Sequence, residues 1–232
     1  MSPPLNPGDA AYAAIREEIL RGRLAPGAPL SRRALAEQYG VGLPAIGDAL
    51  RRLEDERLIE NRAQAGHRVR VYTDADVREL YELREGLETQ AARLFSQRAT
   101  PAHRLELRRL AEQIDVLFAR LASNPDDAEF RFTVHRYHVQ FHLWIAEHAR
   151  SPLLRSIMDR EHVLILNWLF DLSGRRTPLP PKFHAKLADA LGSRDAAQAD
   201  AAMRAHVRYG LTEVSAQIAL AATDRRPRKT RG

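Results

Sequence analysis

Histidine is the residue type in this chain whose spacing best suits binding chemistry. His138 and His142 lie four residues apart, which places both imidazoles on one face of any helix that contains them. His184 and His206 lie in two later segments. Neutral imidazole nitrogen is a good ligand for zinc, nickel and copper. These side chains can act together only if the fold brings their segments side by side.

The enzyme motifs that use such histidines are absent from the sequence. A di-iron carboxylate site needs inward glutamates and Glu-x-x-His pairs, and the chain has no Glu-x-x-His. It also lacks the His-Glu-x-x-His motif of zinc proteases and a glycine-rich phosphate loop. No acid or base partner is expected beside the histidines. The sequence therefore predicts a protein that is not an enzyme.

The composition limits the class of protein further. A chain of 232 residues suits one or two domains, and the absence of cysteine excludes disulfides and thiolate metal sites. No apolar run is long enough to span a membrane, and MSPPLNPGDA lacks a signal-peptide core. We therefore expect a cytoplasmic protein with no membrane partner.

The net charge of +6 is concentrated at one end of the chain. Residues 225–231 carry five positive charges, which leaves a net charge of +1 on the rest. Such segments are typically disordered and attract phosphates without specificity, so we predict a basic disordered tail over 224–232. Any case for DNA binding must rest on the shape of the fold.

The first part of the chain, residues 9–73, has the pattern of a winged helix-turn-helix domain. Helical spacing of apolar residues covers 9–21, turn residues fill 24–29, and Ser31 can cap a helix over 32–39.

The recognition helix and the wing follow. Gly40-Val41-Gly42 predicts a tight turn, and Pro44 lies early in the next helix, where its missing N–H costs nothing. Leu58–Glu60 and Arg68–Val71 are strand-like, with the wing tip at Gln64-Ala65-Gly66. In this fold the third helix enters the major groove of DNA.

Residues 74–223 show only helical periodicity and predict a helical bundle, whose interior can hold a ligand or a metal. Thr73 or Asp74 should cap its first helix after a short hinge. The fold class is therefore mostly α, a winged helix-turn-helix followed by an all-α bundle of about six helices. The predicted helices are 76–97, 101–122, 126–149, 152–172, 179–191 and 196–222.

The N-terminal residues resemble the GntR family of bacterial transcription regulators. The strings ILRGRLAPGAPLSRRALAEQYGV and ALRRLEDERLIE and the wing ending GHRVRV carry the resemblance. It implies a homodimer on a pseudo-palindromic double-stranded operator, most often as a repressor. The residues expected at the DNA are Arg33, Leu43, Pro44, Arg51, Arg52, Arg62, Gln64, Gly66, His67 and Arg68.

The recognition helix departs from the family pattern. Where the family has Ser-Arg-Thr-Pro-Val-Arg-Glu, this chain has Gly42-Leu43-Pro44-Ala45-Ile46-Gly47-Asp48, so Leu43 and Gly47 replace two arginines. Arginine bidentate to guanine is worth about 1–3 kcal/mol of base discrimination. Leu43 can still touch a thymine methyl, and other arginines can contact phosphates. The family's usual operator cannot be carried over, and weakened sequence-specific reading is an open alternative.

The helical region resembles the FCD ligand-binding domain of the FadR-type branch of the family. Phe141-His142 and the segments Phe183–Leu191 and Ala202–His206 carry this resemblance. In the family an aspartate stands at position 138, and its replacement by imidazole favours zinc, with nickel as the second choice, over magnesium, calcium or manganese. The metal ligands that the resemblance implies are His138, His142, His184 and His206.

The same resemblance implies that a small organic acid is the effector. Arg84 matches a pocket-facing arginine of the family and could pair with the acid's carboxylate, although an ion pair with Glu88 on its own helix is as plausible. Effector binding would change the packing of the first bundle helix and act through the hinge at Thr73. Two alternatives stay open: a metal-free sensor whose protonated histidines bind the anion, and His135 as a pocket residue or alternative ligand.

Overall fold

The computed structural model describes residues 6–160 and 178–224 of the chain. Its packing divides the chain into two compact units, residues 1–72 and 73–232. The predicted basic tail beyond Asp224 and the second half of the predicted helix 152–172 lie outside the described residues.

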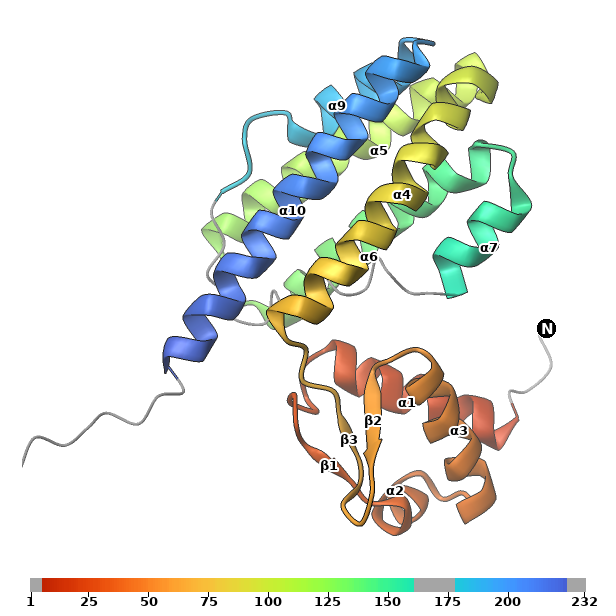
Figure 1. Ribbon diagram of the computed structural model, residues 1–232, viewed down its shortest axis with the longest axis vertical. Coiled ribbons are helices and arrows are strands. Elements are labelled where there is room, and N and C mark those ends of the chain that lie inside the picture. Colours follow the sequence, from red (N-terminus) through yellow and green to blue (C-terminus); the bar gives the residue numbers. More distant parts are fainter. Residues whose placement is uncertain (1–5, 161–177, 225–232) are drawn as a thin grey trace, which may run out of the picture. The chain divides into compact units, whose positions relative to one another are not determined.

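From residue 6 onward, the N-terminal unit contains three helices, α1 (Pro7–Leu20), α2 (Arg32–Tyr39) and α3 (Leu43–Asp55) (Figure 1). The Ser31 hydroxyl accepts a hydrogen bond from the Ala34 N–H at 3.3 Å and so caps α2. The helices enclose an apolar core to which Ile15, Ile46 and Leu50 each contribute a fully buried side chain. The predicted helix-turn-helix is present, and α2 has the predicted bounds.

The wing is a three-stranded antiparallel sheet in the order β1-β3-β2, formed by β1 (Pro29–Leu30), β2 (Ile59–Arg62) and β3 (Gly66–Val69). The predicted strands are present with shifted bounds. The prediction of only turn residues before Leu30 was wrong, because Pro29 and Leu30 pair with β3. A two-residue strand is too short to show an alternating pattern.

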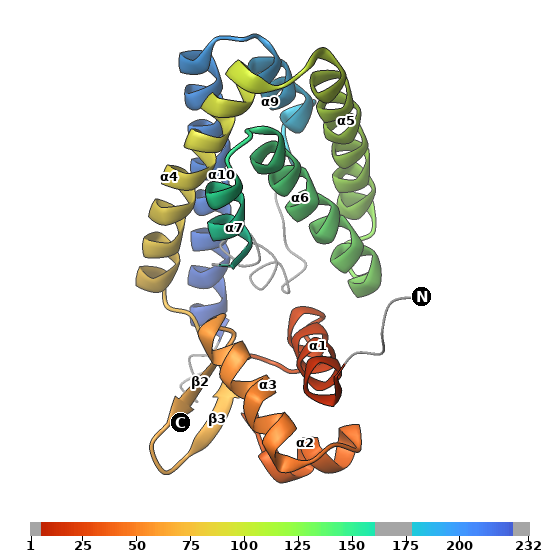
Figure 2. The same ribbon diagram turned by 90° about the vertical axis from the view of Figure 1, so that its right-hand side faces the viewer.

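The C-terminal unit is all helical in the part that the structure describes. Its helices are α4 (Asp74–Arg98), α5 (Pro101–Ser123), α6 (Ala128–His148), α7 (Pro152–Arg160), α9 (Phe183–Gly192) and α10 (Ala196–Asp224). Helices α4 and α10 run antiparallel side by side, and α6 lies between α4 and α5 (Figures 1 and 2). Helix α9 packs against both α5 and α10. This arrangement lets side chains of α4, α6, α9 and α10 meet inside the unit.

Helix ends in this unit follow local capping chemistry. Thr73 forms a capping box with Asp76, in which its hydroxyl accepts from the Asp76 N–H and its own N–H donates to the Asp76 carboxylate. Thr73 is therefore the cap of α4, as one of the two predicted residues. Helix α9 begins four residues later than predicted, because two prolines precede it and Lys182 takes a left-handed φ of 57°.

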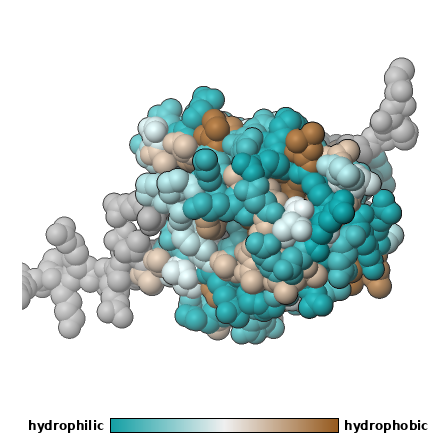
Figure 3. Space-filling view, turned by 90° about the horizontal axis from the view of Figure 1, so that it is seen from above, coloured by the Kyte–Doolittle hydropathy of each residue, from teal (hydrophilic) through white to brown (hydrophobic). Residues whose placement is uncertain are grey.

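The face drawn in Figure 3 is mostly hydrophilic, with hydrophobic residues in small separate patches. Within residues 6–160 and 178–224, we find no helix with the length and apolar character that a membrane span requires.

Candidate functional site

Three of the predicted histidines converge inside the helical unit. His138 and His142 come from α6 and His206 comes from α10, and each offers a ring nitrogen within 4.8 Å of the others. The Nε2 atom of His142 lies 3.0 Å from that of His138 and 3.2 Å from that of His206. All three side chains are buried. We refer to these three residues as the histidine cluster.

His184 borders the cluster without joining it. Its ring centroid lies 4.9 Å from that of His138 and 5.3 Å from that of His206. Its Nδ1 atom lies 2.8 Å from an Asp115 carboxylate oxygen. His135 is buried on the same helix as the cluster, but its ring packs edge-on against Phe118 and it is not part of the cluster.

Two carboxylates adjoin these histidines, which corrects the expectation that no acidic partner lies nearby. The buried Glu88 carboxylate on α4 contacts Nδ1 of His142 and Nε of Arg84. Asp115 on α5 also accepts the backbone N–H groups of His184 and Ala185, at 2.9 and 3.1 Å. A carboxylate on the outer nitrogen of a histidine fixes the ring and raises its basicity as a metal ligand.

Glu88 and Asp115 were not equally predictable from the sequence. Glu88 lies one helical turn from Arg84, so the ion pair between them could be predicted. The contact of Glu88 with His142 could not, because it depends on the packing of α4 against α6. Asp115 and His184 are 69 residues apart in the sequence, and no local sequence pattern predicts their contact.

Burial and neighbouring charges set the protonation of the site. Burial lowers the pKa of His138 and His206 well below the usual 6.5, and the neighbouring histidines and Arg84 act in the same direction. Burial would raise the pKa of Glu88, but Arg84 and His142 outweigh it and lower that pKa to about 2. His138 and His206 therefore present neutral imidazoles, the form that binds metals, beside the ionised Glu88 carboxylate.

Arg84 is fully buried beside the cluster, and only part of its hydrogen-bonding capacity is used. Its Nε atom pairs with Glu88, and its guanidinium lies 5.2 Å from the centre of the Tyr81 ring. Its Nη1 atom has no hydrogen-bond partner among the residues that the structure describes. The predicted alternative, an ion pair between Arg84 and Glu88, is thus present, and it leaves one donor of the guanidinium without a partner.

A hollow of about 30 Å³ lies next to these groups. At about 10–15 Å³ for each water-sized group, it has room for a carboxylate head but not for a whole metabolite. A larger groove of about 480 Å³ lies among α5, α6 and α7, and none of the four predicted metal ligands lines it. The side chains around the small hollow include Arg84, Phe118, His138, His184, His206 and Tyr209.

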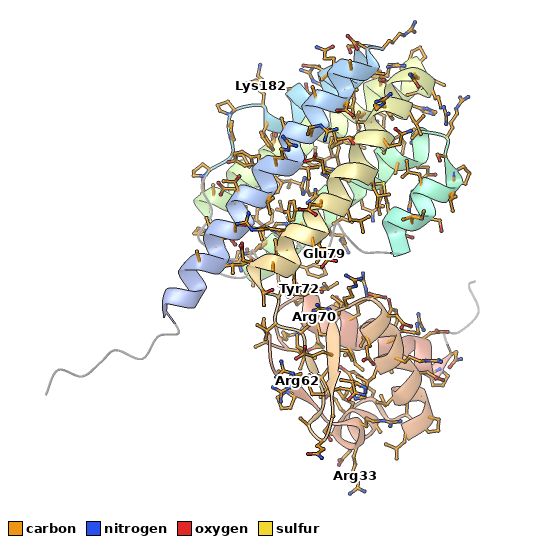
Figure 4. All side chains as sticks on the ribbon, viewed as in Figure 1. Arg33, Arg62, Arg70, Tyr72, Glu79 and Lys182 are labelled. Atoms are coloured by element: carbon orange, nitrogen blue, oxygen red, sulfur yellow. The ribbon has the colours of Figure 1, made fainter. Side chains whose placement is uncertain are left out.

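The predicted DNA-contact residues lie on α2, on α3 and in the wing. Arg33 extends from α2 away from the rest of its unit (Figure 4). Leu43 begins α3 with 50% of its surface exposed, and Pro44 beside it is also exposed. Gln64 and Gly66 form the exposed wing tip with positive φ angles of 64° and 72°. His67 and Arg68 are half-buried in β3.

Three of the predicted DNA-contact arginines already have acidic partners. Arg51 pairs with Asp48 at 3.0 Å, and Arg62 in the wing pairs with Glu60 at 2.7 Å. Arg52 pairs with Asp9 of α1 at 2.6 Å, and its guanidinium lies 3.7 Å from the centre of the Tyr12 ring. Arg52 thus ties α3 to α1.

The chain is similar to two known protein families and to several named regulators. Residues 79–209 match the family described as "FCD domain", and residues 7–69 match "Bacterial regulatory proteins, gntR family". The HTH-type transcriptional regulator LutR of Bacillus subtilis is 27% identical over 215 residues, which cover 82% of this chain and 92% of the relative. The HTH-type transcriptional repressor GlaR of Escherichia coli is 26% identical, with 84% and 90% covered.

A solved structure shows the same fold. E. coli McbR/YncC superposes with a TM-score of 0.69 at 21% sequence identity, over 92% of this chain and 99% of that one.

Proposed function

This chain belongs to the GntR family of bacterial regulatory proteins and carries an FCD domain after its winged helix, and we propose that a small organic acid, bound beside a metal in the helical unit, controls its affinity for DNA. The family and the named relatives are transcription regulators, not enzymes. Relatives that are named repressors favour repression that the acid releases.

The observation that carries the proposal is the convergence of three buried imidazoles from two helices. Their nitrogens are within reach of one ion, and nitrogen ligands favour zinc, then nickel, over the cations that prefer oxygen. His184 borders them and is the proposed fourth ligand. A bound metal would supply positive charge and a coordination position for a carboxylate.

The open donor of Arg84 supports the carboxylate half of the proposal. A buried guanidinium nitrogen without a partner is costly unless a ligand satisfies it. Arg84 lines the same hollow as His138 and His206, so one carboxylate there would meet both the guanidinium and the imidazoles. The adjoining Glu88 pairs with the Nε atom of Arg84, which leaves Nη1 available for an acid.

The helix that carries Arg84 offers a route to the DNA-binding unit. Helix α4 begins at Asp74, directly after the boundary between the two units at Tyr72 and Thr73. An acid that binds Arg84 would favour one position of α4 over another, and it can shift DNA affinity only by that preference. In the proposed homodimer, α4 of each subunit would act on its own winged helix.

A thermal-shift screen of small organic acids tests this function. The full chain, purified without nickel resin, is screened with zinc and again with a chelator. We expect at least one acid to raise Tm with zinc, because a ligand of the native state stabilises by mass action. His142→Ala should abolish that shift.

Each other outcome of the screen has a defined meaning. If no acid raises Tm with zinc present, the effector proposal is wrong. If an acid acts equally well with the chelator, the metal-free alternative replaces the metal assignment.

A further inference from the structure

The outward face of α3 carries a glycine where a side chain could stand. Ile46, Ala49 and Leu50 of this helix are buried. Leu43, Gly47 and Arg51 follow one another at intervals of four residues along a different face, and both Leu43 and Arg51 are exposed. Gly47 therefore lies in the middle of the surface that a recognition helix turns toward the major groove.

The space above Gly47 is filled by an arginine from another helix. A Cβ atom added at Gly47 would lie 2.7 Å from Nη2 and 3.7 Å from Cζ of Arg32, the first residue of α2. Gly47 has no positive φ that would require glycine, and glycine is among the least favoured residues inside a helix. The contact with Arg32 gives a reason for glycine that the backbone does not.

The charge of Arg32 is also unused. Arg51 and Arg52 on α3 have carboxylate partners. Arg32 is exposed and makes no hydrogen bond or ion pair within the described ranges. Its guanidinium thus lies beside Gly47 on the outward face of α3, with its fork of donors available.

We propose that Arg32 reads a base edge in the major groove and supplies from α2 the guanidinium that α3 itself lacks. The chemistry of a guanidinium fork selects guanine, whose O6 and N7 atoms accept a bidentate pair. Leu43, one turn before Gly47, suits the methyl group of a neighbouring thymine. The regulator is then a sequence-specific reader that prefers a guanine next to a thymine in each half-site. This inference needs only the DNA-binding role of the family and is independent of the metal and the acid.

The test is selection from a randomised DNA duplex library with the full-length protein, without acid, followed by affinity measurements on the enriched site. The wild-type protein should enrich a half-site that contains a guanine. Arg32→Ala should reduce the preference for that guanine about 5- to 150-fold. Arg32→Lys keeps the charge and the salt dependence of binding but lacks the fork, so it should lose the preference as well.

Gly47→Ala provides a variant that removes no charge. Its methyl group would displace the flexible end of Arg32, and alanine favours the helix, so the protein should fold at least as stably. It should lose the guanine preference, and combining it with Arg32→Ala should add little further loss. Arg33→Ala is the matched control, which should weaken binding to all sequences alike, as expected for a phosphate contact.

Three results would overturn the proposal. The first is a wild-type protein that enriches no sequence. The second is an Arg32→Ala variant that keeps the guanine preference while binding all sequences more weakly, which would make Arg32 a phosphate contact. The third is full additivity of the Arg32 and Gly47 substitutions. None of these results bears on acid binding in the helical unit.

Discussion

Glu88 is a single buried carboxylate that contacts two different side chains of the candidate site. It contacts Arg84, which faces the hollow, and His142, which belongs to the histidine cluster. All three side chains are at most 2% exposed, so each depends on the others for its charge balance. Removing one partner of a buried pair leaves the other charge uncompensated.

Glu88→Gln tests this dependence. We expect it to lower the free energy of unfolding by about 3–5 kcal/mol, because Arg84 remains buried without a counter-charge. Chemical denaturation of the metal-free protein measures the loss. Glu112→Gln is the matched control, because it breaks an exposed pair with Arg108 and should cost far less. Equal losses in the two variants would contradict the assigned role of Glu88.

The stability of the protein at acidic pH should also depend on Glu88. The folded-state pKa of Glu88 is about 2, against an ordinary value of 4.5. Its stabilising contribution is therefore fully present above about pH 4.5 and is lost as the pH falls toward 2. We expect the wild-type protein to lose about 3 kcal/mol more than Glu88→Gln over this range. Parallel stability curves for the two proteins would refute the expectation.

At the scale of the elements, two bundle helices begin with a threonine cap of the same type but at different places in the molecule. Thr73 and Thr100 each form a capping box, on α4 and α5. Only Thr73 lies at the boundary between the two units.

Substitution of these two caps separates stability from coupling. Thr73→Ala and Thr100→Ala should each cost about 1 kcal/mol of stability, measured by denaturation. Only Thr73→Ala should also reduce the change in DNA affinity that an effector acid causes, measured with zinc and the acid that raises Tm most. An equal reduction in both variants would show that α4 is not the route between the units.

The elements also show where sequence reasoning succeeds and where it fails. Helix α2 and the start of α5 at Pro101 were predicted as found, because local signals such as Ser31 and Pro101 define them. Strand β1 was missed because only its partner strand makes it a strand. The spacing of His138 and His142 on one helix predicted that they would lie together, whereas Glu88 and Asp115 reach the histidines only through packing between helices.

At the scale of the whole molecule, the proposed homodimer would place two recognition helices on one DNA duplex. A symmetric dimer reads half-sites about one helical turn, ~34 Å, apart. The fold provides one winged helix per chain, so operator spacing reports on the assembly.

A change in the spacing of the half-sites tests the proposed homodimer. Inserting about 5 base pairs between the half-sites moves them to opposite faces of the duplex and should sharply weaken binding. Moving the same 5 base pairs outside the half-sites is the control and should have little effect. Titration of labelled duplexes in a gel-shift assay measures both, and insensitivity to the insertion would argue for binding by single subunits.

The double role of Asp115 has a consequence for ion selection. Its carboxylate fastens the imidazole of His184 and, at the same time, closes the opening turn of α9. A movement of that ring toward an ion would therefore also disturb the hydrogen bonds that Asp115 accepts from the backbone of α9. In the proposed metal site, adjustment to ions of different size or preferred geometry would therefore come from α6 and α10, and His184 would be the ligand whose position stays fixed.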